Sequence, residues 1–254
     1  MLGTCKLCLN TSELQRSHII GKSVFNNLFK NTEGNFGYTT YVKDRKIEKT
    51  NEHWTSYLLC TQCENLLNSR YENYALWSLK NKQNGVKHKN KQNYLQIQNI
   101  NQSRLIMYVI SIFWRAIHSK HKVFQNINFS NEIENHLRIC IIQNQIPNKN
   151  FIYVKIFKLI NTTNTLKNIN LKDFICNIVQ TKSTNELSFY TIFEGYYFEI
   201  IFSINDNYKL SDLGVLNPRK KTLNIPHKEL FSIEDFINYW QKTRDIYFES
   251  KNNS

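Results

Sequence analysis

The 254-residue sequence is poor in glycine and proline and contains no long apolar run. Seven glycines and three prolines exclude collagen-like chains and glycine-rich repeat architectures. The longest apolar run, residues 105–114, is about half the ~20 residues that span a bilayer, and arginines bound it on both sides. It therefore predicts a buried helix. The N-terminus lacks the apolar core of a signal peptide, so we expect a cytoplasmic protein without membrane contact.

Acidic residues are scarce relative to basic ones. The chain has 33 Lys and Arg against 20 Asp and Glu, which gives a formal net charge of +13 and a pI near 9.4. A protein this basic usually meets a polyanion, and nucleic acid is the leading candidate before an anionic membrane surface. A lysine-rich solvated surface is the plain alternative. Hydrophobic residues at 41% suffice for a packed core in one large domain or two small ones.

Cysteine is limited to six residues, yet four of them form two C-x-x-C pairs, Cys5 with Cys8 and Cys60 with Cys63. In a reducing compartment such pairs indicate a metal site more often than a disulfide. Four thiolates satisfy tetrahedral zinc, and because no position stays open this zinc would be structural. Incidental cysteines are the alternative. The cysteines at 140 and 176 stand in apolar surroundings and are expected to be buried thiols.

Hydrophobic periodicity predicts a module of short elements over residues 1–80. Residues 21–30 predict a short helix, residues 36–49 a hairpin with Asp44 near its turn, and residues 60–80 an uninterrupted helix. The lysine-rich segment 81–93 follows. We interpret it either as a basic linker at a domain boundary or as a loop that contacts phosphates.

The remaining residues, 94–254, predict a second domain that contains both helices and strands. Residues 101–122 predict a largely buried helix, residues 130–143 a second helix with Ser130 as its N-cap, and residues 232–248 an amphipathic third. Four short segments rich in β-branched and aromatic residues predict one antiparallel sheet: residues 151–160, 173–181, 187–193 and 196–204. The predicted fold class is therefore α+β.

Between the two cysteine pairs lies "SHIIGK", residues 17–22. A C-x-x-C, a His about ten residues later before two β-branched residues, and a second C-x-x-C opening a helix resemble the zinc-knuckle branch of the HNH nucleases. These nucleases share the ββα-metal finger, and the resemblance covers residues 1–80. It implies that His18 is the general base that activates water against a phosphodiester. It also implies one Mg²⁺ or Mn²⁺ ion, held at the positions of Ser17 and Glu64.

The sequence departs from this family pattern at several positions. Ser17 stands where the family has Asp, and a neutral hydroxyl is a poor Mg²⁺ ligand. Glu64 replaces His or Asn and returns one carboxylate to the site. The Asn expected before the second cysteine pair is missing, so Asn51 or His53 would substitute only if the intervening segment folds back. Gly21 replaces a Pro, which we interpret as a minor change.

Further charged residues complete the list of candidates. Glu72 follows Glu64 by about two helical turns, and we interpret it as a surface salt-bridge partner rather than a second carboxylate of the site. Arg115 is expected to end the apolar run or to pair internally with a carboxylate. Contacts to phosphate would supply affinity and salt dependence rather than sequence choice. They are predicted for these basic residues: Lys22, Lys87, Lys89, Arg219, Lys220 and Lys221.

The resulting hypothesis is a metal-dependent, HNH-like endonuclease that hydrolyses phosphodiester bonds in nucleic acid. DNA is favoured as the substrate by the resemblance alone, and some HNH relatives act in defence against phage, which suggests that setting. One alternative is a catalytically inactive, zinc-dependent nucleic-acid-binding protein, which the missing Asp and Asn favour. Another is a subunit of a larger defence complex, with a protein partner or a second copy of the chain.

Overall fold

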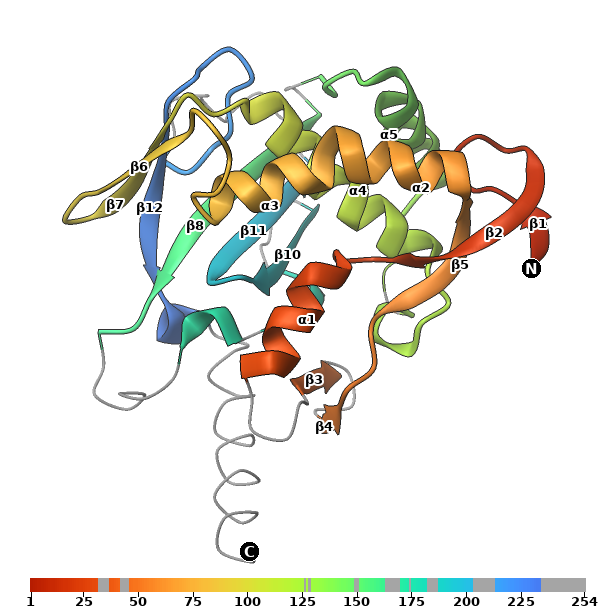
Figure 1. The fold of residues 1–254 in the computed structure, drawn as a ribbon, viewed down its shortest axis with the longest axis horizontal. Coiled ribbons are helices and arrows are strands. Elements are labelled where there is room, and N and C mark those ends of the chain that lie inside the picture. Colours follow the sequence, from red (N-terminus) through yellow and green to blue (C-terminus); the bar gives the residue numbers. More distant parts are fainter. Residues whose placement is uncertain are drawn as a thin grey trace, which may run out of the picture.

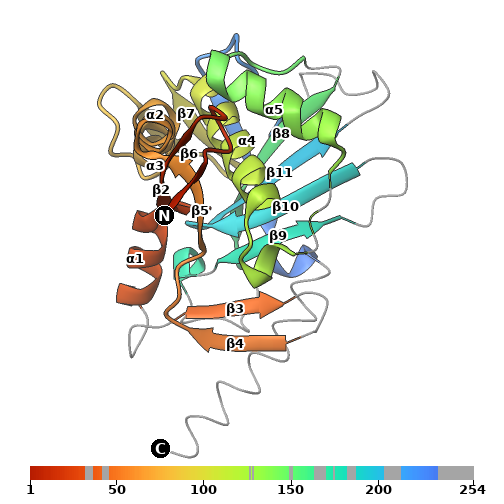
Figure 2. The same cartoon turned by 90° about the vertical axis from the view of Figure 1, so that its right-hand side faces the viewer.

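The computed structural model describes residues 1–31, 37–41, 46–125, 127, 129–148, 151–162, 170–173, 175–181, 187–202 and 213–233. Within these residues the chain is a mixed α+β protein, as the sequence predicts. A seven-stranded sheet lies behind a layer of helices, and a small three-stranded sheet carries the N-terminus (Figure 1). The turned view shows helix α4 running between the large sheet and the helices of residues 61–79 (Figure 2).

The N-terminal sheet brings the two halves of the zinc-knuckle pattern together. Strand β1 (Leu2–Thr4) pairs antiparallel with one edge of β2 (Thr11–His18). Strand β5 (Thr55–Cys60) pairs antiparallel with the other edge, which gives the order β1-β2-β5. The strand that ends at His18 is therefore flanked by β1, its neighbour in sequence, and by β5, which is distant in sequence.

Two predicted elements follow β2. Helix α1 (Lys22–Asn31) begins directly after the "SHIIG" segment, where the short helix is predicted. Strands β3 (Gly37–Tyr41) and β4 (Lys46–Thr50) pair antiparallel and confirm the predicted hairpin. Its turn, which includes Asp44, lies outside the described residues.

The predicted helix after the second cysteine pair is continuous but not uniform. It begins as α2 (Thr61–Leu67), passes through a π-helical turn η1 (Asn68–Glu72) and ends as α3 (Asn73–Leu79). A π-helical turn contains an extra residue, so it rotates the following side chains relative to those of a regular α-helix. The sequence predicts the helix but gives no sign of the π-helical turn.

The larger sheet has seven strands in the order β6-β7-β12-β8-β11-β10-β9. They are β6 (Lys87–Asn90), β7 (Tyr94–Gln98), β8 (Ile152–Ile160), β9 (Cys176–Gln180), β10 (Leu187–Phe193), β11 (Tyr196–Phe202) and β12 (Leu223–Glu229). The four predicted strands, β8 to β11, are neighbours and antiparallel as expected. Strand β12 was not predicted. It pairs with β8 in parallel and with β7 antiparallel, and so joins the two parts of the sheet.

Strand β6 lies within the segment that the sequence suggests is a basic linker. It pairs antiparallel with β7, with Lys87 opposite Gln98 and Lys89 opposite Gln96. It also forms one edge of the sheet, a place where lysines discourage pairing with another chain. The linker interpretation is therefore wrong for residues 87–90, which belong to the sheet.

Helices α4 (Gln102–His118) and α5 (Asn131–Gln143) confirm the two helices predicted after residue 100. The Ser130 hydroxyl accepts a hydrogen bond from the Ile133 N–H at 3.3 Å, which is the predicted N-cap. No helix in the described part of the chain combines the length and apolar character needed to cross a bilayer. The helix expected from Ser232 onward falls almost entirely outside the described residues.

Apolar side chains from both predicted domains join one cluster. It contains Trp54, from the segment before β5, and Trp114, from α4, and both are fully buried. The Trp54 ring meets the Phe124 ring edge-on, with centroids 5.5 Å apart. Burial of such large aromatic surfaces is a main source of folding free energy. Residues 1–80 are therefore packed against the helices that follow them.

Candidate metal centre and histidine site

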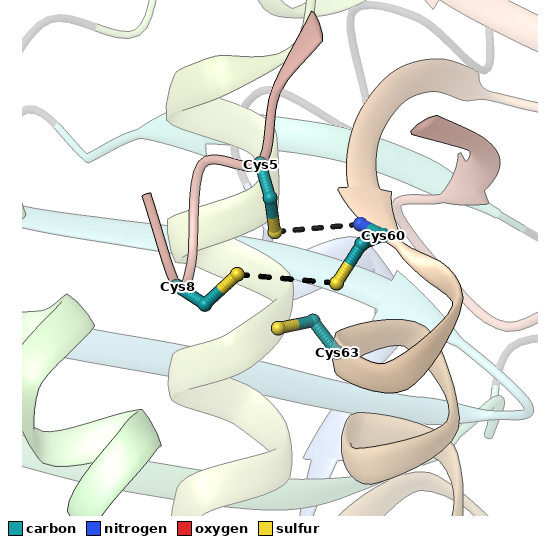
Figure 3. A group of neighbouring side chains, drawn as sticks. All are labelled: Cys5, Cys8, Cys60 and Cys63. Carbon is teal, nitrogen blue, oxygen red and sulfur yellow. Dashed lines mark hydrogen bonds between the residues drawn. The ribbon is translucent and has the colours of Figure 1, made fainter. Parts of the chain in front are cut away.

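The two C-x-x-C pairs meet at one end of the N-terminal sheet. Cys5 and Cys8 lie in the turn between β1 and β2, whereas Cys60 ends β5 and Cys63 lies in the first turn of α2 (Figure 3). The four sulfur atoms lie within 4.8 Å of one another, and those of Cys8 and Cys60 are 3.9 Å apart. Zn–S bonds near 2.3 Å place tetrahedral sulfurs about 3.8 Å apart. The cluster could therefore bind a metal ion such as zinc.

Backbone hydrogen bonds fix the turn that carries Cys5 and Cys8, the first C-x-x-C pair. The Leu9 N–H donates to the Cys5 carbonyl and the Cys5 N–H donates to the Asn10 carbonyl, each at 2.9 Å, and Leu9 closes the turn with a φ of 65°. The Cys60 N–H donates to the Cys5 sulfur at 3.3 Å. Burial alone would raise the pKa of the Cys60 thiol, but hydrogen bonds from the Cys63 amide and the neighbouring thiols outweigh it and lower this pKa to about 7. Burial, together with the contacts among the thiols, raises the pKa of the Cys63 and Cys8 thiols, so a metal ion that binds the four thiolates would displace protons from these sulfurs.

His18 is the last residue of β2, and it stands beside His53 from the segment before β5. Its Nε2 atom lies 3.2 Å from Nδ1 of His53, so the two rings share a hydrogen bond, and they meet edge to face. The Phe25 ring of α1 stacks on His53, with centroids 5.1 Å apart. The Ile19 N–H donates to the Trp54 carbonyl at 2.9 Å, which continues the pairing beyond the strands. The segment before β5 therefore folds back onto His18.

Burial and positive neighbours keep both imidazoles neutral at pH 7. Burial, His53 and Lys22 lower the pKa of His18 to about 4. Burial, Lys22 and Arg16 also lower the pKa of His53. A phosphate group between Arg16 and Lys22 would offset their charge and raise the pKa of His18. The site therefore combines neutral proton acceptors with a positive potential.

Ser17 and Glu64, the predicted ligands of a catalytic ion, each carry a buried oxygen atom without a partner. The Ser17 side chain is fully buried, and neither its Oγ nor Oε2 of Glu64 has a hydrogen-bond partner among the described residues. In that part of the chain, however, the four cysteines are the only group of three or more His, Cys, Asp or Glu side chains close enough to share an ion. Ser17, His18 and Glu64 therefore do not form a complete site for Mg²⁺ or Mn²⁺.

Glu72 is not a surface residue, so that interpretation of the sequence is wrong. Its side chain is 16% exposed, and its Oε2 lies 3.5 Å from Nη2 of Arg115, which is 2% exposed. Arg115 also donates from Nη1 to the backbone carbonyl of His18 at 2.5 Å. The internal pairing of Arg115 with a carboxylate is thus confirmed. Through Arg115, the pair thus contacts the backbone of His18, the predicted general base.

The predicted phosphate-contacting residues fall into two regions. Lys22, at the start of α1, is exposed and lies close enough to His18 to lower its pKa. The Ile100 N–H, just after β7, donates to the Lys221 carbonyl at 2.9 Å and holds the turn before β12 beside the β6–β7 hairpin. The exposed residues of this second region are Lys87 and Lys89 in β6 and Arg219, Lys220 and Lys221 in the turn.

Comparisons of the chain with protein-family models, with curated proteins and with solved structures give no match. The HNH resemblance therefore rests on the motif residues alone. What the chain does has to be argued from those residues and from the geometry around them.

Two members of the site were missed or left conditional by sequence reasoning. His53 was considered only on the condition that its segment folds back, which spacing alone does not decide. Arg115 lies 97 positions from His18, too far for any local pattern to connect them. A usable signal did exist: an arginine inside an apolar helix needs a buried acceptor or carboxylate, because burial of an unpaired charge is costly.

Proposed function

We propose that the chain is an HNH-like nuclease that hydrolyses phosphodiester bonds in nucleic acid. The observation that carries this proposal is the order of the elements around His18. Strand β2 ends at His18, β5 pairs with it antiparallel, and β5 passes directly into α2 through Cys60. Two antiparallel strands and a helix, held by a cysteine cluster, match the order of the ββα-metal finger that the motif resembles.

In this proposal His18 accepts a proton from the attacking water. The imidazole is neutral at pH 7, as a proton acceptor must be, and the nearby charges of Arg16 and Lys22 attract the phosphate. Binding of the phosphate raises the pKa of His18 toward the range in which a general base is effective. His53 takes the place of the family's Asn, because its hydrogen bond orients the His18 ring.

A divalent ion completes the proposed site only together with further oxygen ligands. Mg²⁺ or Mn²⁺ would stabilise the negative charge that develops on the phosphate and on the leaving oxygen. Of the residues in the structure, Glu64 and Ser17 have oxygen atoms to offer, and their unpaired state fits that role. Mg²⁺ is commonly bound through one or two carboxylates together with phosphate oxygens and waters. Glu64 supplies one carboxylate and the neutral Ser17 hydroxyl is a poor ligand, so phosphate oxygens and waters would have to supply most of the coordination.

The second basic region extends the proposed contact with nucleic acid. Lys87 and Lys89 lie two residues apart in β6, so their side chains point to the same face of the sheet. Opposite them on that face, the Gln98 side-chain amide donates to Gln96, and the Gln96 amide donates to Asn224, each at 3.1 Å. A polar face with lysines and the adjacent basic turn would bind phosphates without reading the bases.

A cleavage assay with matched variants tests the proposal. Zinc-loaded protein is incubated with supercoiled DNA, linear DNA and RNA in Mg²⁺ or Mn²⁺, with a chelator control. We expect cleavage by the wild type and by His227→Ala, which changes a histidine in β12, and at least a hundredfold loss in His18→Ala. Cleavage that survives His18→Ala would contradict the assignment of the base.

One observation favours a second candidate function. Because the described residues do not assemble a three-ligand site for the catalytic ion, the chain could bind nucleic acid through its zinc module without cutting it. That function predicts retardation of DNA or RNA in a gel with no cleavage by any variant. If the protein neither cuts nor binds, the subunit hypothesis gains support, and the next experiment is mass determination of the native complex.

A further inference from the structure

The ion pair between Glu72 and Arg115 requires an explanation that stability does not supply. Arg115 is 2% exposed and Glu72 16% exposed. Transfer of two charges into the protein interior costs several kcal/mol per ion, and a well-packed apolar pair of similar size is often at least as stable. Burial raises the pKa of Glu72, as expected for a carboxylate removed from water. A buried pair of this kind is better explained by what its groups hold in place.

The guanidinium of Arg115 holds three groups at once. Its Nη1 donates to the carbonyl of His18 at 2.5 Å, its Nε donates to the carbonyl of Ser111 at 3.3 Å, and its Nη2 donates to Oε2 of Glu72 at 3.5 Å. The Ser111 contact fixes the guanidinium to its own helix, α4. The His18 contact therefore ties the end of β2 to α4, and Glu72 compensates the charge of the guanidinium.

The π-helical turn brings Glu72 to this position. In a regular α-helix residues 64 and 72 would differ by about 80° around the axis, since each residue turns about 100°. One extra residue in the turn at Asn68–Glu72 reduces this difference to about 20°. Glu72 thus lies on nearly the same face as Glu64, and the negative charge of Glu64 contributes to the raised pKa of Glu72. A π-helical turn often marks a functional site.

Gly21, three residues after His18, completes the arrangement. A Cβ atom built on Gly21 would overlap the Glu72 carboxylate, so any other residue at this position would force the carboxylate to move. The proline of the family pattern also has a Cβ and would meet the same obstacle. The exchange of Pro for Gly is therefore not a minor change, as the sequence alone suggests, because it makes room for Glu72.

We propose that Glu72 and Arg115 are positioning residues that clamp the segment from His18 to Gly21, and so hold the His18 imidazole against His53. The clamp acts on the backbone that follows the His18 side chain: Arg115 holds the His18 carbonyl, and the Glu72 carboxylate lies against Gly21. Its catalytic consequence rests on the proposed nuclease function. The position of the imidazole does not, and it can be measured in a protein that cuts nothing.

The test compares Glu72→Gln with a control that removes another buried carboxylate. Glu194, 6% exposed, pairs with Lys80 at 2.6 Å and lies in the turn between β10 and β11. Its Oε1 also accepts a hydrogen bond from Asn27 of α1 at 3.0 Å, which the amide oxygen of glutamine can still accept. The readout is the coupling between ¹⁵N nuclei across the hydrogen bond from His18 to His53, recorded at one fixed pH with labelled histidine. We expect the coupling to disappear or shift in Glu72→Gln and to stay unchanged in Glu194→Gln, even where both variants lose thermal stability.

A second pair of variants covers the case in which Glu72→Gln fails to fold. Gly21→Ala pushes the carboxylate away without a change of charge, and we expect the same loss of the coupling. In a Glu72→Ala background the space is free, so Gly21→Ala should add nothing further, which makes the double-mutant cycle non-additive. If the protein is active, kcat should fall on the order of tenfold to hundredfold in Gly21→Ala, with KM nearly unchanged.

Two experimental results would contradict the proposed clamp. An unaltered His18–His53 coupling in both Glu72→Gln and Gly21→Ala would mean that the pair only stabilises the fold. Additive effects in the double-mutant cycle would mean that Gly21 and Glu72 act independently. A protein without nuclease activity would contradict the proposed function alone, because the coupling in these variants still decides whether the clamp exists.

Discussion

His18 and His53 share a hydrogen bond although 35 positions separate them in the chain. A different neighbouring residue holds each of the two histidines in position. Phe25 stacks on His53, and Arg115 holds the His18 backbone. Two half-buried imidazoles beside Arg16 and Lys22 make up a site that favours neutral rings until an anion arrives. At the scale of single residues, this histidine pair is the feature that most strongly supports a role in proton transfer.

Removal of the second imidazole should raise the pKa of His18. His53→Ala removes an imidazole whose protonation opposes that of His18 and opens the site to water, and both changes favour protonated His18, whose pKa in the wild type is about 4. The unfolded chain binds this proton near pH 6.5. The free energy of unfolding should therefore decrease as the pH is lowered from 6.5 to 4, and it should decrease by less in the variant. NMR titration of the His18 ring measures the pKa directly.

The outcome that would contradict this prediction is a His18 pKa that stays the same or falls in His53→Ala. His88→Ala is the matched control for the titration. His88 has a pKa lowered by burial in the same direction, but its Nε2 contacts the carbonyl of Ser78 at 2.7 Å, away from His18. Its removal should leave the His18 titration unchanged.

At the scale of elements, the cysteine cluster adds a link between two segments that the pairing of β2 with β5 already brings together. The β1–β2 turn supplies two sulfurs and the junction of β5 with α2 supplies the other two. Arg138 of α5 adds a second tie, since its Nη1 donates to the Leu7 carbonyl in the first knuckle at 3.1 Å. A metal in this cluster would hold the strand that ends at His18 against the helix that carries Glu64.

Loss of one cysteine of the cluster should remove the metal and loosen this junction. We expect Cys60→Ser to lose its zinc, measured as metal content per chain, and to unfold at a Tm lower by roughly 5–10 °C, since a structural zinc contributes several kcal/mol. The control is Cys140→Ser, which changes a buried cysteine outside the cluster. Equal metal content in both variants would show that the four cysteines do not bind zinc.

At the scale of the whole molecule, the histidine site depends on elements from both halves of the chain. Arg115 comes from α4, and the loop after this helix also contacts β5, where the hydroxyls of Ser56 and Ser119 share a hydrogen bond at 3.0 Å. His121 faces Glu52 at 3.3 Å, one residue before His53. Residues 1–80, which contain the HNH-like motif, are therefore supported at the histidine site by α4 and the loop that follows it.

A fragment of residues 1–80 should accordingly fail to form the site. It would expose the apolar surface that packs on α4 and leave Glu72 without Arg115. We expect little cooperative unfolding in the fragment and no coupling between His18 and His53, even with zinc bound. Calorimetry and ¹⁵N spectra check this against the full chain. A fragment that unfolds cooperatively and keeps the coupling would show that residues 1–80 are an independent domain.

Local features were predictable because their physical causes lie within a few residues. Ser130 caps α5 because a hydroxyl at that position reaches the N–H three residues later. The C-x-x-C spacing by itself brings two sulfurs to one side of a turn. Strands β8 to β11 follow from short apolar segments of high β-propensity. In each case the chain needs no distant partner to take that form.

Within the described residues, the amino-acid sequence by itself thus determined the positions of the helices, four of the seven strands of the large sheet and the cysteine pairs. Tertiary structure decided the approach of His53 to His18, the contact of Arg115 with both His18 and Glu72, and the parallel pairing of β12 with β8. The reason is physical. These contacts join residues that are distant along the chain, and they exist only because a shared apolar core brings β2, α2 and α4 together.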